Sequence, residues 1–205
     1  MRELGRQGRV LLLATAVAVG LVGCGGGSFT DSRDGKKYKT VKIGYQTWMA
    51  KNLNYQTESG SWCYEDKADN CKKYGRLYNW NTANVVCPKG WHLPSRDEWT
   101  ELVTAVGGRT TGGDKLKSKI GWNVCIGGKN GTDDFGFSAL SGGGRSSDRF
   151  HDAGCNGEWW TSTEYIRDGT AYCLFMGMIF GNVSGVSESA NLKSYGISVR
   201  CVADT

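Results

Sequence analysis

The amino-acid sequence predicts a single α+β domain with short strands, one well-capped helix and long loops. Three observations support this class: a helix pattern over residues 96–106, several strand patterns after it, and a composition of 31 glycines, eight tryptophans and two prolines in 205 residues. A helix followed by separate strands is typical of α+β architecture. Many glycines with bulky aromatic anchors indicate a loop-rich domain rather than a helical bundle. No segment recurs with a period of about 20 to 50 residues, and the chain length suits one core.

The first 23 residues have the pattern of a cleaved signal peptide. Arg2, Arg6 and Arg9 form a basic start, and residues 10–22 are all apolar or small. This stretch is shorter than the roughly 20 residues needed to cross a hydrocarbon core. We therefore expect an export signal that is removed, not a membrane-spanning helix.

Leu21, Val22, Gly23 and Cys24 resemble the lipobox of bacterial lipoproteins, in which a branched and a small residue precede a cysteine. The resemblance implies cleavage before Cys24 and acyl chains on its thiol and on the new amino group, which together give firm anchoring. Gly25 is not the aspartate that retains Gram-negative lipoproteins in the inner membrane, so we expect the outer membrane or cell surface. The alternative is an ordinary secretory signal with a chance cysteine.

Residues 24–30 are expected to be a lipidated cysteine and a flexible tether, because Gly25, Gly26, Gly27 and Ser28 follow Cys24. The folded domain is predicted over residues 31–204. Removal of the signal peptide, with its three arginines and one glutamate, lowers the formal net charge from +5 to +3. That charge is too small to indicate a nucleic-acid partner, which requires clustered lysine and arginine.

Seven cysteines follow Cys24, and an oxidising compartment allows them to pair. Because seven is odd, at least one free thiol or intermolecular bond is expected. No Cys-x-x-Cys motif occurs, and His92 and His151 lack the spacing of metal ligands, so neither a metal nor another cofactor is expected. The seven are Cys63, Cys71, Cys87, Cys125, Cys155, Cys173 and Cys201.

The first predicted element is a hairpin. Residues 38–43 alternate imperfectly between apolar and polar, Gly44 and Tyr45 can make the turn, and residues 46–50 return with Trp48 as a core anchor.

The next predicted element is the helix over residues 96–106. Ser95 and Glu98 form a capping box at its start, and Gly107 is placed to end it. Its apolar side chains recur at i, i+3, i+4 and i+7, which places them on one face of a helix. They are Trp99, Leu102, Val103 and Val106.

After this helix the patterns are shorter. Residues 115–120 indicate a second short helix, and strands are predicted over residues 135–140, 158–163, 170–178 and 197–202, separated by glycine and polar turns.

Seven unusual strings occur in order along the chain: DGKKYKTVKIG (34–44), QTWMAKNLNY (46–55), YGRLYNW (74–80), CPKGWHLPS (87–95), GGGR (142–145), WTST (160–163) and VRCV (199–202). Together they resemble the Fibrobacter succinogenes major paralogous domain, from about residue 31 to residue 203. That family occurs in large sets of exported bacterial proteins, has no known function, and is similar in fold to C-type-lectin-like and formylglycine-generating-enzyme-like domains. The resemblance implies a C-type-lectin-like fold more than an activity.

The resemblance also implies a long disulfide between Cys87 and Cys201. Cys63 and Cys71 are close enough in sequence for a local bond. A pairing of Cys155 with Cys173 would leave Cys125 odd, and the alternative is that several of these cysteines are buried free thiols.

Catalytic chemistry is not indicated. There is no Gly-x-Ser-x-Gly motif, and only two histidines are present. Formylglycine-generating relatives use a cysteine pair near the end of the domain, but Cys173 and Cys201 do not stand in a comparable context. Asp133 and Asp134 would serve a glycosidase only with a partner at a suitable distance and are better explained as a solvated turn. We therefore expect no enzyme activity.

Calcium-dependent sugar binding is not indicated, because the Glu-Pro-Asn, Gln-Pro-Asp and Trp-Asn-Asp triplets of calcium-dependent lectins are absent. Sugar binding would therefore have to use another surface. Aromatic rings suit the apolar faces of sugars, although core packing is the better explanation for most of the candidate rings. Arg145 and His151 lie in a glycine-rich stretch that is either a binding loop or only a surface loop. The candidate aromatic residues are Trp62, Trp122, Trp159 and Tyr165.

The sequence thus predicts a surface-anchored, non-catalytic binding or adhesion module for polysaccharide or a surface protein. The alternative is a structural envelope or matrix protein, crosslinked through an accessible Cys125. An enzyme related to formylglycine-generating folds ranks third.

Overall fold

The computed structural model describes residues 26–122, 125, 128–166, 169–176 and 185–205. The expected signal peptide and Cys24 lie outside these ranges, and so do residues 177 and 178 of the predicted strand 170–178. Within these ranges, no helix is long and apolar enough to cross a membrane.

One sheet has five strands, in the spatial order β1 (Gly27–Thr30), β2 (Lys37–Ile43), β3 (Gln46–Met49), β13 (Val202–Ala203) and β6 (Trp91–His92). The predicted hairpin is confirmed as β2 and β3, and Gly44 turns the chain at φ +60°. Gly27 and Ser28 were expected in the tether but pair with β2. Phe29 explains this strand, because its ring stacks on Tyr38 and Trp91 at centroid distances of 5.5 and 4.9 Å.

The second sheet has six strands, in the order β11 (Val186–Leu192), β10 (Thr170–Met176), β9 (Gly157–Glu164), β12 (Ile197–Ser198), β5 (Leu77–Tyr78) and β4 (Ser61–Trp62). β9 and β10 confirm the strands predicted there. The single strand predicted over residues 197–202 is wrong, because residues 199–201 carry the chain from β12 in one sheet to β13 in the other. A separate hairpin joins β7 (Gly144–Ser146) and β8 (Arg149–His151).

The helices are α1 (Ala68–Tyr74), α2 (Trp80–Val86), α3 (Arg96–Ala105) and α4 (Gly112–Leu116), with a 3-10 turn η1 (Tyr64–Asp66). α3 confirms the predicted helix and its capping box: the Ser95 hydroxyl accepts from the Glu98 N–H, and the Glu98 carboxylate accepts from the Ser95 N–H. Gly107, at φ +104°, follows its last turn.

Two other predictions near α3 are wrong. The helix predicted over residues 115–120 begins earlier and ends at Leu116, because Lys117 takes an extended conformation. Residues 135–140 form a loop in which Ser138 has φ +52°. Phe137 and Ala139 are buried, which explains the alternation, but only Ala139 forms a β-bridge, with Lys117.

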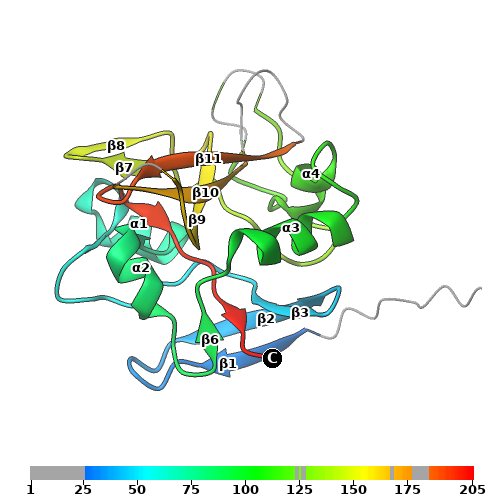
Figure 1. The fold of residues 1–205 in the computed structure, drawn as a ribbon, viewed down its shortest axis with the longest axis horizontal. Coiled ribbons are helices and arrows are strands. Elements are labelled where there is room, and N and C mark those ends of the chain that lie inside the picture. The colour runs from blue at the N-terminus through cyan, green and yellow to red at the C-terminus, as the bar shows by residue number, and fades with distance from the viewer. Residues whose placement is uncertain (1–25, 123–124, 126–127, 167–168, 177–184) are drawn as a thin grey trace, which may run out of the picture.

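The core consists of two apolar clusters. One gathers side chains of the five-stranded sheet, α3 and β9, including Trp48, Trp99 and Trp159. The other includes Tyr78, Trp160, Ile197, Val199 and Cys201. Both clusters contain members of both sheets, so the sheets fold as one unit (Figure 1).

A polar connection between the sheets lies inside this core. Arg200 and Asn52 are buried, and the Asn52 Oδ1 accepts from the Arg200 Nη2 at 2.7 Å and from the Trp159 Nε1 at 2.9 Å. The Asn52 amide donates to the Tyr74 carbonyl at 2.8 Å. The Arg200 guanidinium also donates to the carbonyls of Phe137, Met49 and Ser138. Burial lowers the pKa of Arg200 to about 9, which leaves it charged at neutral pH.

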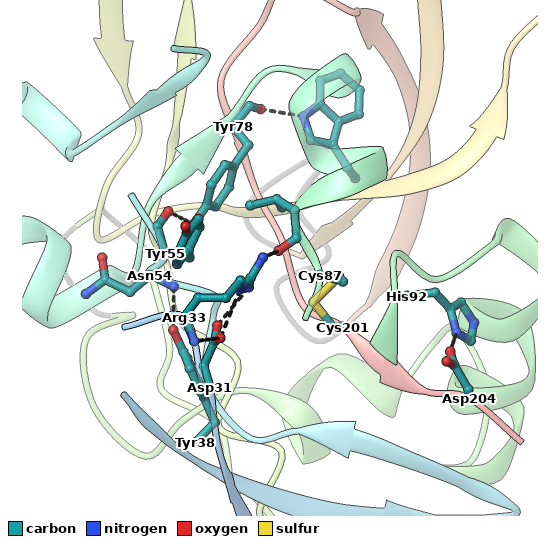
Figure 2. The surroundings of a disulfide bond; sticks show 12 residues. Asp31, Arg33, Tyr38, Asn54, Tyr55, Tyr78, Cys87, His92, Cys201 and Asp204 are labelled. Atoms are coloured by element: carbon teal, nitrogen blue, oxygen red, sulfur yellow. Dashed lines mark hydrogen bonds and ion pairs between the residues drawn. A yellow bond between two sulfur atoms is a disulfide. The ribbon is translucent and has the colours of Figure 1, made fainter. Parts of the chain in front are cut away.

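Three disulfides link the described residues. Cys87–Cys201 (Figure 2), with a Cα–Cα distance of 6.0 Å, and Cys63–Cys71, at 4.9 Å, confirm two predicted pairings. The pairing of Cys155 with Cys173 is wrong, because Cys155 bonds to Cys125 across a Cα–Cα distance of 5.5 Å. Cys173 is the free thiol, and it is buried in β10. The disulfide-stabilised α+β class is therefore confirmed.

Candidate functional site: the Arg145 face

Arg145 is held where the β7–β8 hairpin meets the edge of the six-stranded sheet. Its backbone N–H and C=O exchange two hydrogen bonds of 2.8 Å with Gly196. A Cβ atom on Gly196 would lie 3.1 Å from both the Trp62 ring and the Arg145 Cβ. Glycine at this position therefore allows Arg145 and Trp62 to approach each other closely.

The Arg145 guanidinium lies against two aromatic rings. Its central carbon is 4.5 Å from the centroid of Trp62 and 5.7 Å from that of Phe150, which is the residue opposite Arg145 in the hairpin. Tyr64 continues the layer, with its ring 5.3 Å from Phe150. All four side chains are partly exposed. We call Trp62, Tyr64, Arg145 and Phe150 the Arg145 face.

The charge of Arg145 has no opposite charge beside it in the described part of the chain. Among the described residues it forms no ion pair with a carboxylate, and its Nε atom is buried without a hydrogen-bond partner. Stacking fixes the plane of a guanidinium and leaves its N–H edges directed sideways. A fixed, unpaired guanidinium on aromatic rings can recognise a carboxylate or other anionic group by bidentate hydrogen bonds.

Two of the expected face residues lie elsewhere. His151 pairs with Gly144 in the hairpin, one position along from the Arg145–Phe150 pair, so its side chain points to the opposite face of the hairpin. Tyr165 packs edge-to-face on Tyr172 of β10, at 4.9 Å. In the six-stranded sheet β9, β12 and β5 separate β10 from the strand that carries Trp62.

Trp122 and Trp159 are not part of any binding face, which corrects the prediction for both. Their exposed fractions are 1% and 0%. The Trp122 indole N–H donates to the Ala139 carbonyl at 2.9 Å, as the Trp159 indole does to Asn52. Core packing with internal acceptors accounts for both rings.

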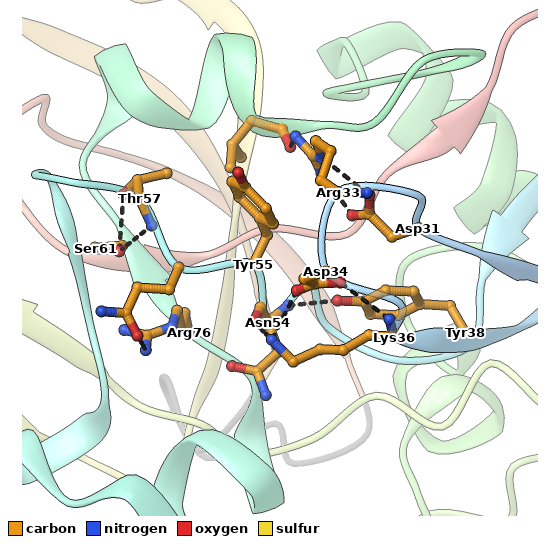
Figure 3. Close-up of polar contacts among 12 residues, drawn as sticks. Asp31, Arg33, Asp34, Lys36, Tyr38, Asn54, Tyr55, Thr57, Ser61 and Arg76 are labelled. Carbon is orange, nitrogen blue, oxygen red and sulfur yellow. Dashed lines mark hydrogen bonds and ion pairs between the residues drawn. The ribbon is translucent and has the colours of Figure 1, made fainter.

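A groove of about 1200 Å³ lies beside β1 and β2. Its lining comes from residues 26–28, β2, the carboxy-terminal end of α1 and the loop over residues 135–140. Lys36 ties the start of β2 to the neighbouring segment, because its Nζ donates to the Asp34 carboxylate and to the Asn54 carbonyl at 2.7 Å each (Figure 3). The Asn54 N–H donates in turn to the Tyr38 hydroxyl.

His92 is held between two carboxylates. Its Nδ1 lies 2.7 Å from a carboxylate oxygen of Asp204 (Figure 2), and its Nε2 lies 2.7 Å from one of Glu98, so both ring nitrogens are engaged within the fold. The Ser95 hydroxyl is engaged in the cap of α3. Desolvation lowers the pKa of His92, but the hydrogen bonds to Asp204 and Glu98 outweigh it and raise the net pKa above 6.5.

Cys173 lies in a buried polar group with Glu158 and Asn191. The Asn191 amide nitrogen is 3.0 Å from the Glu158 carboxylate and 3.3 Å from the Cys173 sulfur. Burial raises the pKa of both the Cys173 thiol and the Glu158 carboxyl. A protonated, buried thiol is a poor nucleophile.

The family model described as the Fibrobacter succinogenes major domain matches residues 41–203. No curated protein and no solved structure matches the chain. The matched range contains most of both sheets, the three disulfides and the Arg145 face, whereas the likeness to C-type-lectin-like domains stays a prediction. The chain belongs to the Fibrobacter succinogenes major domain family.

Proposed function

We propose that this chain is a lipid-anchored, non-catalytic binding module that holds its ligand at the Arg145 face. The observation that carries the proposal is the Arg145 guanidinium, fixed against Trp62 and Phe150 without a carboxylate partner among the described residues. A buried or half-buried guanidinium left unpaired is costly to the fold, so its pairing with a ligand gains free energy.

The chemistry of this face fits an acidic polysaccharide. The guanidinium would bind the carboxylate of a uronic acid residue, and the edges of Trp62 and Tyr64 would contact the apolar faces of neighbouring sugar rings. A surface protein with an exposed carboxylate is the alternative partner. The buried Cys173 and the fully engaged ring of His92 support a non-catalytic role.

The anchor is proposed at Cys24, which would place the module on the outer membrane. In Figure 1, β1, the strand nearest this cysteine in sequence, and the β7–β8 hairpin lie at opposite ends of the molecule. A module anchored through β1 would therefore present Arg145 away from the bilayer. This orientation suits adhesion.

A structural envelope protein crosslinked through Cys125 is less favoured than a binding module. Cys125 forms a disulfide with Cys155, and the free Cys173 is buried.

The proposal is tested by binding of the full-length chain, in a neutral detergent, to polygalacturonate, glucuronoxylan, neutral xylan and cellulose, with and without calcium. We expect saturable binding to the two acidic polysaccharides. Arg145→Lys should lower the affinity at least about tenfold, because lysine keeps the charge but lacks the planar guanidinium that forms bidentate hydrogen bonds. Arg149→Lys is the matched control in the same hairpin, and its affinity should not change.

Equal affinities of the Arg145 and Arg149 variants would exclude the Arg145 face as the site. If the folded chain bound none of the four polysaccharides, the carbohydrate ligand would be wrong.

A further inference from the structure

The groove beside β1 and β2 is strongly basic. Its lining contains six lysines and, among the described residues, no aspartate or glutamate. The six are Lys36, Lys37, Lys39, Lys51, Lys72 and Lys73.

Four of these lysines are free to attract an anion. Lys36 pairs with Asp34 at 2.7 Å and Lys72 with Asp69 at 2.8 Å. Lys37, Lys39, Lys51 and Lys73 have no carboxylate partner in the described part of the chain. All four are exposed, so their charges face solvent.

The groove lies next to the proposed anchor. Gly26, Gly27 and Ser28 belong to its lining. Cys24 and Gly27 are three positions apart in the sequence, and such a span reaches at most about 11 Å. An acylated Cys24 would therefore hold this edge of the groove within that distance of the lipid headgroups.

We propose that the groove docks on anionic phospholipid headgroups of the membrane that holds the anchor, and thereby fixes the orientation of the domain. The inference rests on the anchoring part of the proposed function but not on glycan binding. Lysines near an anionic bilayer are attracted to its headgroups, and a basic patch beside an acyl anchor is a recognised second membrane signal.

The position of the groove favours a lipid over a soluble acidic glycan. An anchor three residues away keeps headgroups at high effective concentration around the lysines, whereas a polysaccharide must reach the groove from solution. The Arg145 face lies outside the lining of the groove and remains open to such a ligand.

The test uses the full-length lipoprotein, reconstituted in vesicles of phosphatidylcholine alone or with phosphatidylglycerol. Lysine amines are acylated with a water-soluble reagent, and the label at each lysine is read by mass spectrometry. We expect Lys37, Lys39, Lys51 and Lys73 to be labelled several-fold less in the anionic vesicles. The protection should disappear at high salt, because salt screens exposed charges.

Two lysines outside the lining serve as internal controls, Lys42 on the same strand and the exposed Lys119, and their labelling should be equal in both vesicles. Lys39→Glu should reduce the protection of Lys51 and Lys73. Lys42→Glu, the matched charge reversal on β2, should not.

Equal labelling of the four lysines in both vesicles would overturn the inference. So would protection by soluble polygalacturonate in neutral vesicles without protection by phosphatidylglycerol, which would assign the groove to glycan. The mass of the amino-terminal peptide reports the anchor separately, and an unacylated Cys24 would also overturn the inference. None of these readings depends on the affinity of the Arg145 variants.

Discussion

At the scale of single residues, the fold depends on a few buried polar side chains that connect its two sheets. Asn52 is the clearest case, since its side-chain amide forms hydrogen bonds with Arg200, Trp159 and Tyr74. No sequence pattern distinguishes this asparagine from those in surface loops. The acceptors that hold Trp122 and Trp159 in the core are likewise distant in sequence or in a loop, which is why both rings could be mistaken for a surface pair.

Replacing Asn52 by alanine tests this connection. The change leaves the Trp159 N–H and the Tyr74 carbonyl without partners and removes two hydrogen bonds from Arg200. We expect the free energy of unfolding to fall by about 3 to 5 kcal/mol in urea titrations. Asn84→Ala is the control, because the Asn84 amide donates only to Trp80 in its own helix. Equal losses for the two variants would refute a special role for Asn52.

His92 should make the stability depend on pH. Its pKa in the folded chain is raised above 6.5, so its stabilising contribution is complete below pH 6.5 and is lost as the pH rises through the folded pKa. His92 is partly exposed, so the loss should be below about 1 kcal/mol. Relative to His92→Gln, the native chain should lose this amount of unfolding free energy across that window. Parallel pH curves for the two proteins would show that the contacts of His92 with the two carboxylates contribute nothing.

At the scale of elements, prediction succeeded where local signals were complete. The residues that form the capping box of α3, and those that form the glycine turn of the β2–β3 hairpin, are close together in the sequence. α1 and α2 were missed because each has only seven residues, too few for a periodic pattern. In the loop over residues 135–140, apolar and polar residues alternate as in a strand because Phe137 and Ala139 face the core. The sequence does not show whether another strand lies beside this segment to pair with it.

Gly75 illustrates how tightly α1 packs on the segment that contains Asn52. Its φ is +80°, and a Cβ atom would lie 2.7 Å from the Asn52 Cβ and 2.9 Å from the Leu53 carbonyl oxygen. Gly75→Ala should lower the free energy of unfolding by about 2 to 4 kcal/mol through backbone strain and overpacking. Gly90→Ala is a matched control, since Gly90 has φ +83° and nothing within 4 Å of its Cβ position.

The control should lose only the backbone cost of about 1 kcal/mol. The difference between the two melting temperatures therefore measures the close packing at Gly75. If both variants had the same melting temperature, α1 would not pack on the Asn52 segment as closely as the structure shows.

At the scale of the whole molecule, the ordered motifs identified the family, and the family resemblance implied the long disulfide, which the structure contains. The resemblance could not imply the ligand, since no function is attached to the family. The Cys125–Cys155 bond was missed because cysteine pairing depends on three-dimensional distance, not on spacing.

The disulfides should differ in their effect on stability. Cys87 and Cys201 are 114 residues apart, whereas Cys63 and Cys71 are eight apart. In the chain-entropy model the long bond contributes about 5 kcal/mol and the short one about 2.5 kcal/mol. Urea titrations of the two double alanine variants should show the larger loss for Cys87 and Cys201, and the reverse order would contradict the model for this fold.

The two proposed surfaces divide the molecule into a membrane end and a ligand end. β1 and its side of the lysine groove form the first, and the Arg145 face forms the second (Figure 1). The other side of the groove reaches Tyr74, whose ring lies 6.4 Å from that of Tyr64 on the Arg145 face. Six of the eight tryptophan indoles donate hydrogen bonds inside the protein, which leaves Trp62 and Trp91 without an indole acceptor among the residues that the structure describes. Trp91 packs on β1 at the membrane end, so Trp62 alone reports on the ligand end.

The most direct test is therefore a nitrogen-15 NMR titration of the chain with oligogalacturonate, in which the eight indole N–H signals are followed. The account predicts that the Trp62 signal shifts in a saturable manner while the six internally bonded indoles stay in place, and that Arg145→Lys weakens the shift. A stationary Trp62 signal, or a saturable shift confined to Trp91, would contradict ligand binding at the Arg145 face.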